Sequence, residues 1–185
     1  KSVKSGDEHW HAFYQLGVMY AAAGDLDKAK LYFEQSFRTT PNGWALRCLA
    51  ALLPSDCSRE TAEKLVEAFR LLPLLPLAVE CGKALLKAGN YNGYVDFFDG
   101  LPLEMQHSGR MQAMRIQAAI ELEEFALAQE MLTRNNLEVS DMREGEILLS
   151  DLWVRLWMKK ISVREGLPLD ENLRARVLQE YPVPE

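Results

Sequence analysis

The sequence predicts an all-α protein built from repeated helix pairs. Apolar residues recur at three- and four-residue spacing along most of the chain, which is the period of an α-helix. No run of alternating β-branched residues predicts a strand. Ala29, Ala62, Tyr94 and Ala128 follow one another at intervals of 33, 32 and 34 residues, and such a period indicates stacked helical repeats. We expect about four antiparallel pairs in 185 residues.

The first pair is predicted over residues 8–23 and 26–38. Gly24 ends the first helix, because glycine readily takes the left-handed backbone of a helix C-terminus. Ala29 and Phe33 repeat on one face of the second helix and are expected to point inward.

The second pair is less regular. Its first helix is predicted over 43–53 and ends at Pro54, because proline disrupts a helix interior. Ser58 is the expected N-cap of the second helix. The string 71–77 is so rich in leucine that we interpret it as a buried turn between repeats.

The third and fourth pairs repeat the turn of the first. Residues 89–92 match the glycine turn at 24–27 in spacing and type. In the fourth pair, over 109–136, Glu123 occupies the place of the turn glycine.

After the repeats, a long helix is predicted over 141–164, with Asp141 and Glu144 as a capping box. It is apolar around most of its circumference, so we expect it to cover the exposed end of the array. A shorter helix follows over 170–180. No flexible linker interrupts the chain, which predicts a single domain. Its repeats would span about 10–42, 43–75, 76–108 and 109–140, and its capping helices 141–181.

The first pair also carries a family resemblance. The tetratricopeptide repeat has the pattern W-x2-L-G-x2-Y, then A-x3-F, then P. The corresponding residues here are Phe13, Leu16, Gly17, Tyr20, Gly24, Ala29, Phe33 and Pro41, with Phe13 in place of the tryptophan. This resemblance implies a curved α-solenoid without chemistry of its own, whose concave face binds a peptide or a protein domain.

Composition narrows the partners. The net charge of −6 argues against nucleic acid, because phosphate binding needs a basic field. No apolar run reaches the length of a membrane span. Cys48, Cys57 and Cys81 are odd in number and lack the C-x-x-C spacing, which predicts free thiols in a reducing, cytoplasmic location.

No catalytic, metal or cofactor motif occurs in the sequence. His9 and His11 lie two residues apart on a helix and point in nearly opposite directions, so they cannot share a metal ion. The carboxylates of Glu121, Glu123 and Glu124 are expected to form a solvated helix end. The sequence therefore predicts a protein that is not an enzyme and needs no cofactor.

The candidate binding site is the open face of the first helix in each pair, which lines the concave side of such arrays. The groove residues predicted there are His11, Tyr14, Val18, Trp44, Arg47, Val79, Lys83, Lys87, Arg110, Ala113 and Gln117. Five of these eleven are basic or histidine, which favours an acidic peptide segment as the ligand. The alternative is that long basic side chains simply solvate an empty groove. Trp10 and Trp44 each lie near the start of a first helix, and both are left open between core and groove rim.

Two functions remain open. The first is a non-catalytic scaffold that binds a protein, a peptide or another domain of its own polypeptide. The second is a structural accessory region of a larger enzyme, because the last segment resembles the end of large bacterial proteins in which such repeats follow a β-sandwich region linked to carbohydrate. The chain begins at Lys1 without an initiator methionine, and we interpret it as a piece of a longer protein.

Overall fold

The computed structural model describes residues 9–133 and 149–183, and in these ranges every regular element is a helix. The predicted all-α class is therefore confirmed. The chain divides into two compact units, Lys1–Ala88 and Gly89–Glu185. That the whole chain acts as one domain stays a prediction.

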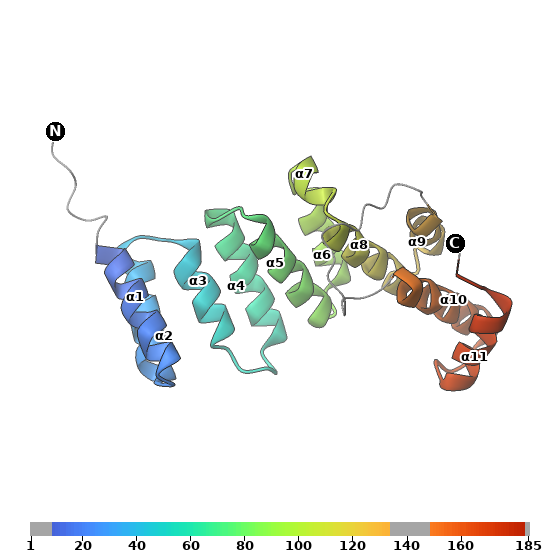
Figure 1. Ribbon diagram of the computed structural model, residues 1–185, viewed down its shortest axis with the longest axis horizontal. Helices are drawn as coiled ribbons and strands as arrows, with labels where there is room; N and C mark the ends of the chain where they lie inside the picture. The colour runs from blue at the N-terminus through green and yellow to red at the C-terminus, as the bar shows by residue number, and fades with distance from the viewer. Residues whose placement is uncertain (1–8, 134–148, 184–185) are drawn as a thin grey trace. The chain divides into compact units, whose positions relative to one another are not determined.

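The first unit is a succession of helices in which each packs against the next. Figure 1 shows α1 and α2 lying side by side in opposite directions, and α3 and α4 doing the same. The five helices are α1 (His9–Ala22), α2 (Leu26–Thr39), α3 (Gly43–Ala51), α4 (Ser58–Leu71) and α5 (Leu75–Lys87).

The first helix pair is held close by small residues at the positions that the repeat pattern requires. A Cβ atom added at Gly17 would lie 2.6 Å from the ring of Phe33, so only glycine lets the two helices approach at this point. Ala29 is fully buried and Phe33 is 2% exposed. The inward positions predicted for α2 are thus confirmed.

Two local predictions in the first unit were wrong. Ser58 is the first residue of α4 rather than its cap, because a turn closed by the Cys57 N–H on the Pro54 carbonyl places Cys57 at the boundary. The leucine-rich string is not a buried turn. Its chain enters α5 at Leu75, so that Leu77 reaches the core at 3% exposure while Leu74 remains 42% exposed.

The second unit places three long helices around a shared core. Its helices are α6 (Tyr91–Asp99), α7 (Leu103–Gln106), α8 (Gly109–Glu121), α9 (Phe125–Thr133), α10 (Leu149–Glu165) and α11 (Glu171–Glu180). Tyr94 is fully buried in α6, and its hydroxyl donates a 2.7 Å hydrogen bond to the Met111 carbonyl in α8. This bond satisfies a polar group that burial would otherwise leave unpaired.

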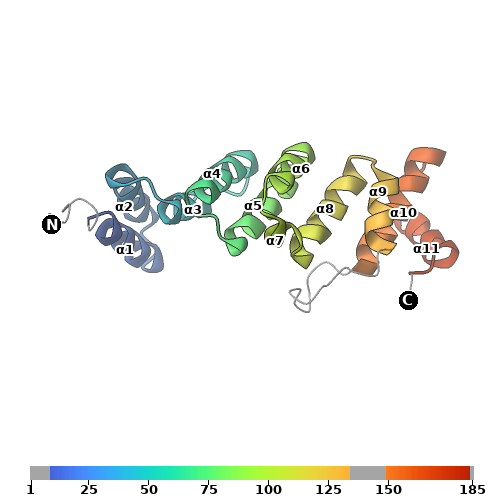
Figure 2. The ribbon, with the colours of Figure 1, turned by 90° about the horizontal axis from the view of Figure 1, so that it is seen from above.

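Helix α10 covers the end of the α8 and α9 pair, as the sequence predicted (Figure 2). Leu152 and Leu156 join the buried core formed by Ile116, Ile120 and Ala128.

The opposite side of α10 packs against α11, where Ile161 meets Leu173 and Val177. At this junction the Trp153 indole donates to the Tyr181 carbonyl at 3.1 Å. Contacts on two sides explain why this helix is apolar around most of its circumference. The predicted capping box at 141–144 lies outside the described residues.

Three turns share one left-handed residue each. Gly24 and Gly89 have φ values of +81° and +68°, and Glu123 has a φ of +63° at the corresponding place. In the first turn the Asp25 N–H donates to the Tyr20 carbonyl, five residues earlier. In the third the Glu124 N–H donates to the Ala119 carbonyl over the same spacing. The sequence placed Glu123 correctly as a substitute for the turn glycine.

Candidate functional site

The first unit carries a small surface cavity lined entirely by aromatic and imidazole rings. Its walls are Trp10, His11 and Tyr14 from α1 and Trp44 from α3, and its volume is about 220 Å³. We call it the aromatic pocket. Both contributing helices are the first members of their pairs, the face that sequence reasoning assigned to the groove.

The rings are arranged edge to face and at tilts rather than in a flat stack. The centroids of Trp10 and His11 are 5.5 Å apart at 80°, and those of His11 and Tyr14 are 6.4 Å apart at 31°. Tyr14 also rests on the buried Phe33 ring, 5.9 Å away. The side-chain amide of Gln15 lies 3.2 Å from His11 Nε2 and steadies the imidazole. The pocket is therefore packed, through Tyr14, against the buried core of the first helix pair.

A buried hydroxyl fixes the spacing of the two tryptophans. Ser36, which is fully buried, donates to the Trp10 carbonyl at 2.8 Å and accepts from the Asn42 side-chain amide at 3.3 Å. Asn42 is the N-cap of α3, accepting from the Ala45 N–H at 2.8 Å, and it lies two residues before Trp44. One serine thus ties the start of α1 to the start of α3, the two places that supply the indoles.

Next to the pocket, Arg47 is fully engaged by a carboxylate. Its Nε and Nη2 donate to the two oxygens of Glu80 in α5, both at 2.7 Å. Both side chains are partly exposed, and the hydrogen bonds that Arg47 donates to Glu80 raise the pKa of Arg47. Because the pair is bidentate, the guanidinium charge is compensated where it meets solvent. The basic character that sequence reasoning gave to this part of the groove is therefore largely cancelled.

Tyr14 links the pocket to a half-buried thiol. Burial raises the pKa of Tyr14, and the electrostatic effect of the neighbouring Cys48 raises it further. Burial also raises the pKa of Cys48, while the neighbouring Tyr14 hydroxyl acts in the opposite direction. Both groups are therefore neutral at physiological pH, and the base of the pocket carries no charge from them.

The remaining predicted groove residues fall into two groups. Lys83 and Lys87 are exposed on α5, and Val18 is exposed on α1. Arg110 and Gln117 are half-buried on α8 in the second unit. Their membership of one groove with the residues of the first unit stays a prediction.

Two of the predicted groove residues are core residues instead. Val79 and Ala113 are each 7% exposed. They lie on the packed side of their helices, which corrects the face assigned to them.

Sequence reasoning missed Glu80 and left Trp10 open between core and groove rim, although a signal for both was present. Tyr14, Arg47 and Glu80 are spaced by 33 residues, and so are His11 and Trp44. Residues one repeat apart occupy equivalent positions on successive first helices, so they become neighbours when the pairs stack. This rule would have paired Arg47 with Glu80. Because His11 and Trp44 are one repeat apart, the rule would also have placed Trp10, the sequence neighbour of His11, close to Trp44 in the pocket.

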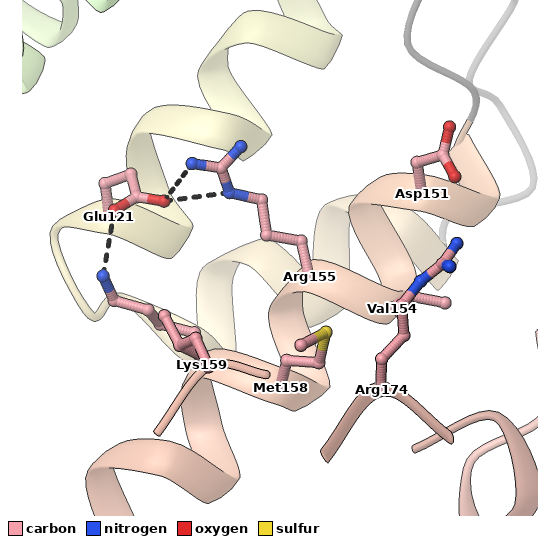
Figure 3. Close-up of a pocket in the computed structure, with 8 residues that line it drawn as sticks. Glu121, Asp151, Val154, Arg155, Met158, Lys159 and Arg174 are labelled. Atoms are coloured by element: carbon pink, nitrogen blue, oxygen red, sulfur yellow. Dashed lines mark hydrogen bonds and ion pairs between the residues drawn. The ribbon is translucent and has the colours of Figure 1, made fainter. Parts of the chain in front are cut away.

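A second cavity, in the second unit, is lined by five charged side chains together with Val154, Met158 and Leu169, and has a volume of about 440 Å³. Figure 3 shows Arg155 and Lys159 of α10 reaching Glu121 at the end of α8, with Asp151 and Arg174 farther from it. Arg155 donates twice to Glu121, at 2.9 and 2.7 Å, and Lys159 donates once at 3.0 Å.

Glu121 is consequently part of a structural ion cluster. Burial acts to raise its pKa, but the hydrogen bonds from Lys159 and Arg155 outweigh burial and hold the pKa below its usual range. Only 11% of its side chain is exposed, so the expectation that Glu121 belongs to a solvated helix end was wrong. The cluster joins α8 to α10 at the edge of their apolar core.

Neither cavity contains a set of side chains that could together bind a metal ion. Within residues 9–133 and 149–183, no three His, Cys, Asp or Glu side chains gather in an arrangement that could hold a metal ion. No helix in the described part of the chain combines the length and the apolar character that a membrane span needs.

The antiparallel pairs, the glycine-dependent contact at Gly17 and the repeated left-handed turns define a tetratricopeptide-like helical repeat protein with an aromatic surface pocket. No family model matches the chain. Over 100 residues it is 31% identical to proteins named penicillin-binding protein activator LpoA, from Shigella flexneri serotypes X and 5b. The aligned part is 53% of this chain and spans only 14% of those relatives.

A solved structure of Pseudomonas aeruginosa PilF is similar at 14% identity. The match covers 97% of this chain and 95% of that one, with a TM-score of 0.39. A likeness at this level carries no argument about function.

Proposed function

We propose that this chain is a non-catalytic protein-binding module, and that the aromatic pocket receives a segment of its partner. The observation that carries the proposal is the pocket itself, in which rings from two successive first helices enclose about 220 Å³ at the surface. Trp44 is 39% exposed although it is among the largest apolar side chains of the chain. Tryptophan and tyrosine are enriched where protein interfaces concentrate their binding energy.

The partial relatives support a binding role. Their name describes them as activators of a penicillin-binding protein, which is action on another protein. This chain spans 14% of their length, so the similarity bears on one region of those proteins. For the present chain, an effect on a partner protein is part of the proposal.

The partner is proposed to be a protein or peptide, or another domain of the same polypeptide. The finer prediction of an acidic segment has less support, because Arg47 is neutralised by Glu80. The alternative function, a structural accessory region of a larger carbohydrate-active enzyme, predicts instead that the pocket is dispensable. A cytoplasmic location remains part of the proposal, supported by three free cysteines in the described structure.

A peptide-display selection tests the proposal. The full 185-residue chain is immobilised and used to select from a random peptide library, and the enriched peptides are then measured on two variants. Trp44→Ala removes one wall of the pocket. Met19→Ala, a matched control, removes a side chain that is 66% exposed on the other side of α1.

We expect the enriched peptides to bind Trp44→Ala at least about tenfold more weakly, the loss usual for a central aromatic anchor. The Met19→Ala variant should bind them as the unmodified chain does. Both variants should keep the helical circular dichroism spectrum. Peptides that ignore the loss of Trp44, or a selection that enriches none, would overturn the proposal.

A further inference from the structure

The cavity of the second unit, which we call the charged cavity, combines a local excess of positive charge with an apolar wall. Its volume is about 440 Å³, and its charged lining consists of three cationic side chains and two carboxylates: Arg155, Lys159, Arg174, Glu121 and Asp151. One positive charge is therefore left over here, in a chain whose net charge is −6. An anion finds at this place a local attraction that the chain as a whole does not provide.

Two of the cations keep donor capacity for a ligand. Glu121 accepts from both Arg155 and Lys159, and one carboxylate balances only one of these two charges. Arg155 uses Nε and Nη2 in this contact, and Figure 3 shows its third guanidinium nitrogen pointing away from Glu121. Arg174 lies 3.9 Å from a carboxylate oxygen of Glu171, whose side chain is 90% exposed, so this ion pair contributes little. Both arginine side chains are 49% exposed and can therefore donate to a ligand.

The rest of the lining is apolar, and the loop that carries part of it is held in place. Val154 is 8% exposed, Met158 is half-buried and Leu169 is 55% exposed. Leu169 lies between α10 and α11, in a segment anchored by Ser162, whose hydroxyl donates to the Leu167 carbonyl at 2.6 Å. Ligand cavities typically combine such an apolar surface with a few polar groups that fix the ligand's orientation. An apolar wall beside two arginines therefore suits a ligand with an apolar body and an anionic end.

The charge and the shape of the lining favour a carboxylate over other anions. In Figure 3 no hydrogen bond or ion pair joins Asp151 to Arg155 or to Arg174, so Asp151 leaves the arginine donors open but still counts in the total charge. One surplus positive charge balances a monoanion, whereas a phosphate monoester, with a charge of about −1.5 to −2, would leave the cavity negative. The planar guanidinium presents paired N–H donors that match the two oxygens of a carboxylate.

We propose that the charged cavity binds a carboxylate carried on an apolar body. The carboxylate lies at Arg155 and Arg174. The apolar body lies against Val154, Met158 and Leu169. A small aliphatic acid has this chemistry, and so does the last residue of a polypeptide that ends in an apolar side chain. The cavity belongs to the second compact unit and shares no residue with the aromatic pocket, so this inference goes beyond the proposed function and is tested independently of it.

Titration of the full chain with small probes tests the required chemistry. Binding is followed by the methyl NMR signal of Met158, which is assigned with the Met158→Leu variant. Hexanoate has both the carboxylate and the apolar body, hexanamide lacks the charge, and acetate lacks the body. We expect hexanoate to bind at least about tenfold more tightly than either, because a charge-assisted hydrogen bond and apolar burial each contribute. An acetylated Gly-Gly-Leu peptide with a free carboxylate distinguishes the source: tighter binding than hexanoate identifies a chain end, and weaker binding identifies a small acid.

Two substitutions with matched controls locate the ligand. Arg174→Gln removes one charge of the cavity and should weaken hexanoate binding at least about tenfold. Arg59→Gln, which changes a side chain that is 88% exposed in the first unit, should leave the binding unchanged. Leu169→Ala should weaken hexanoate binding about threefold or more. Leu178→Ala, which removes a side chain of similar exposure on α11, should have no effect. All four variants should keep the helical circular dichroism spectrum.

Three results would overturn the inference. The first is a Met158 signal that neither hexanoate nor the peptide shifts. The second is equal binding of hexanamide and hexanoate, because the cavity would then select no charge. The third is hexanoate binding that Arg174→Gln leaves unchanged, or that Arg59→Gln weakens equally, because overall charge and not this cavity would then attract the acid. None of these variants alters the aromatic pocket, so each result leaves the proposed function as it stands.

Discussion

The left-handed backbone at Glu123 predicts a stabilising substitution. Glu123 has a φ of +63° in a turn whose equivalents are Gly24 and Gly89. Glycine takes this conformation without steric cost, whereas a Cβ atom is crowded by the following carbonyl. Glu123→Gly should therefore relieve strain in the second unit without changing the fold.

Two opposing effects set the magnitude. The left-handed region costs a residue with a Cβ atom about 1–2 kcal/mol. Glycine also increases the conformational entropy of the unfolded chain, and this effect reduces the gain in stability by about 0.4–1 kcal/mol. The net gain in the free energy of unfolding should be about 0.5–1 kcal/mol, which raises the Tm of a chain of 185 residues by about 1–4 °C.

Thermal unfolding followed by circular dichroism measures this gain. Glu123→Ala is the control, because it removes the carboxylate and keeps the Cβ atom, and it should leave Tm nearly unchanged. Gly24→Ala is the reciprocal change in the first unit and should lower stability, since glycine there has a φ of +81° in open space. Equal gains for Glu123→Gly and Glu123→Ala would show that repulsion near Glu124, and not backbone strain, is the cause.

Four further outcomes follow from the packing and the ion cluster. Trp153→Ala should cost about 3–5 kcal/mol of stability, because the indole is 8% exposed between α10 and α11, and urea unfolding measures it. Tyr94→Phe should cost about 1 kcal/mol in the same assay by leaving the Met111 carbonyl without its buried donor. In native labelling with a maleimide, Cys57 should react first and Cys81 last, since burial raises the pKa of Cys81 to about 12; fast labelling of Cys81 would contradict its place in the core. The pKa of Glu121 is lowered in the folded state, so its contribution is present above its unfolded pKa of about 4.3 and is lost as pH falls through the folded value. Glu121→Gln should make stability less dependent on pH in that acidic window, and an unchanged acid profile would remove Glu121 as a contributor.

The helices could be predicted because their signals are local. Apolar spacing located the helices of the first two pairs, although it gave no sign of the short helix α7, and Gly24 and Gly89 marked helix ends through a backbone requirement that the residue itself satisfies. The predictions at Ser58 and at the leucine-rich string 71–77 failed for the opposite reason. Both depend on which residue a turn places at the helix boundary, and that choice is made by backbone hydrogen bonds rather than by residue type.

The pocket was predictable only in part. His11, Tyr14 and Trp44 were found because the first helix of each pair faces the groove, and the structure brings these three together. The sequence analysis did not predict that Glu80 compensates the charge of Arg47, because Glu80 lies one repeat farther along the chain. A charge on one helix therefore cannot be assigned to a groove until the equivalent position on the next helix has been examined.

The bond network at Ser36 separates two tasks that small binding sites commonly assign to the same residues. The buried hydroxyl and the Asn42 cap fix how far apart the indoles stand, and neither lines the pocket. The rings that line it lie toward solvent, where substitutions usually change stability by no more than about 0.5 kcal/mol. Ligand preference can therefore diverge by exchange of ring residues while the helix spacing stays constant, and proteins with superimposable helix pairs can select different peptides at this one position.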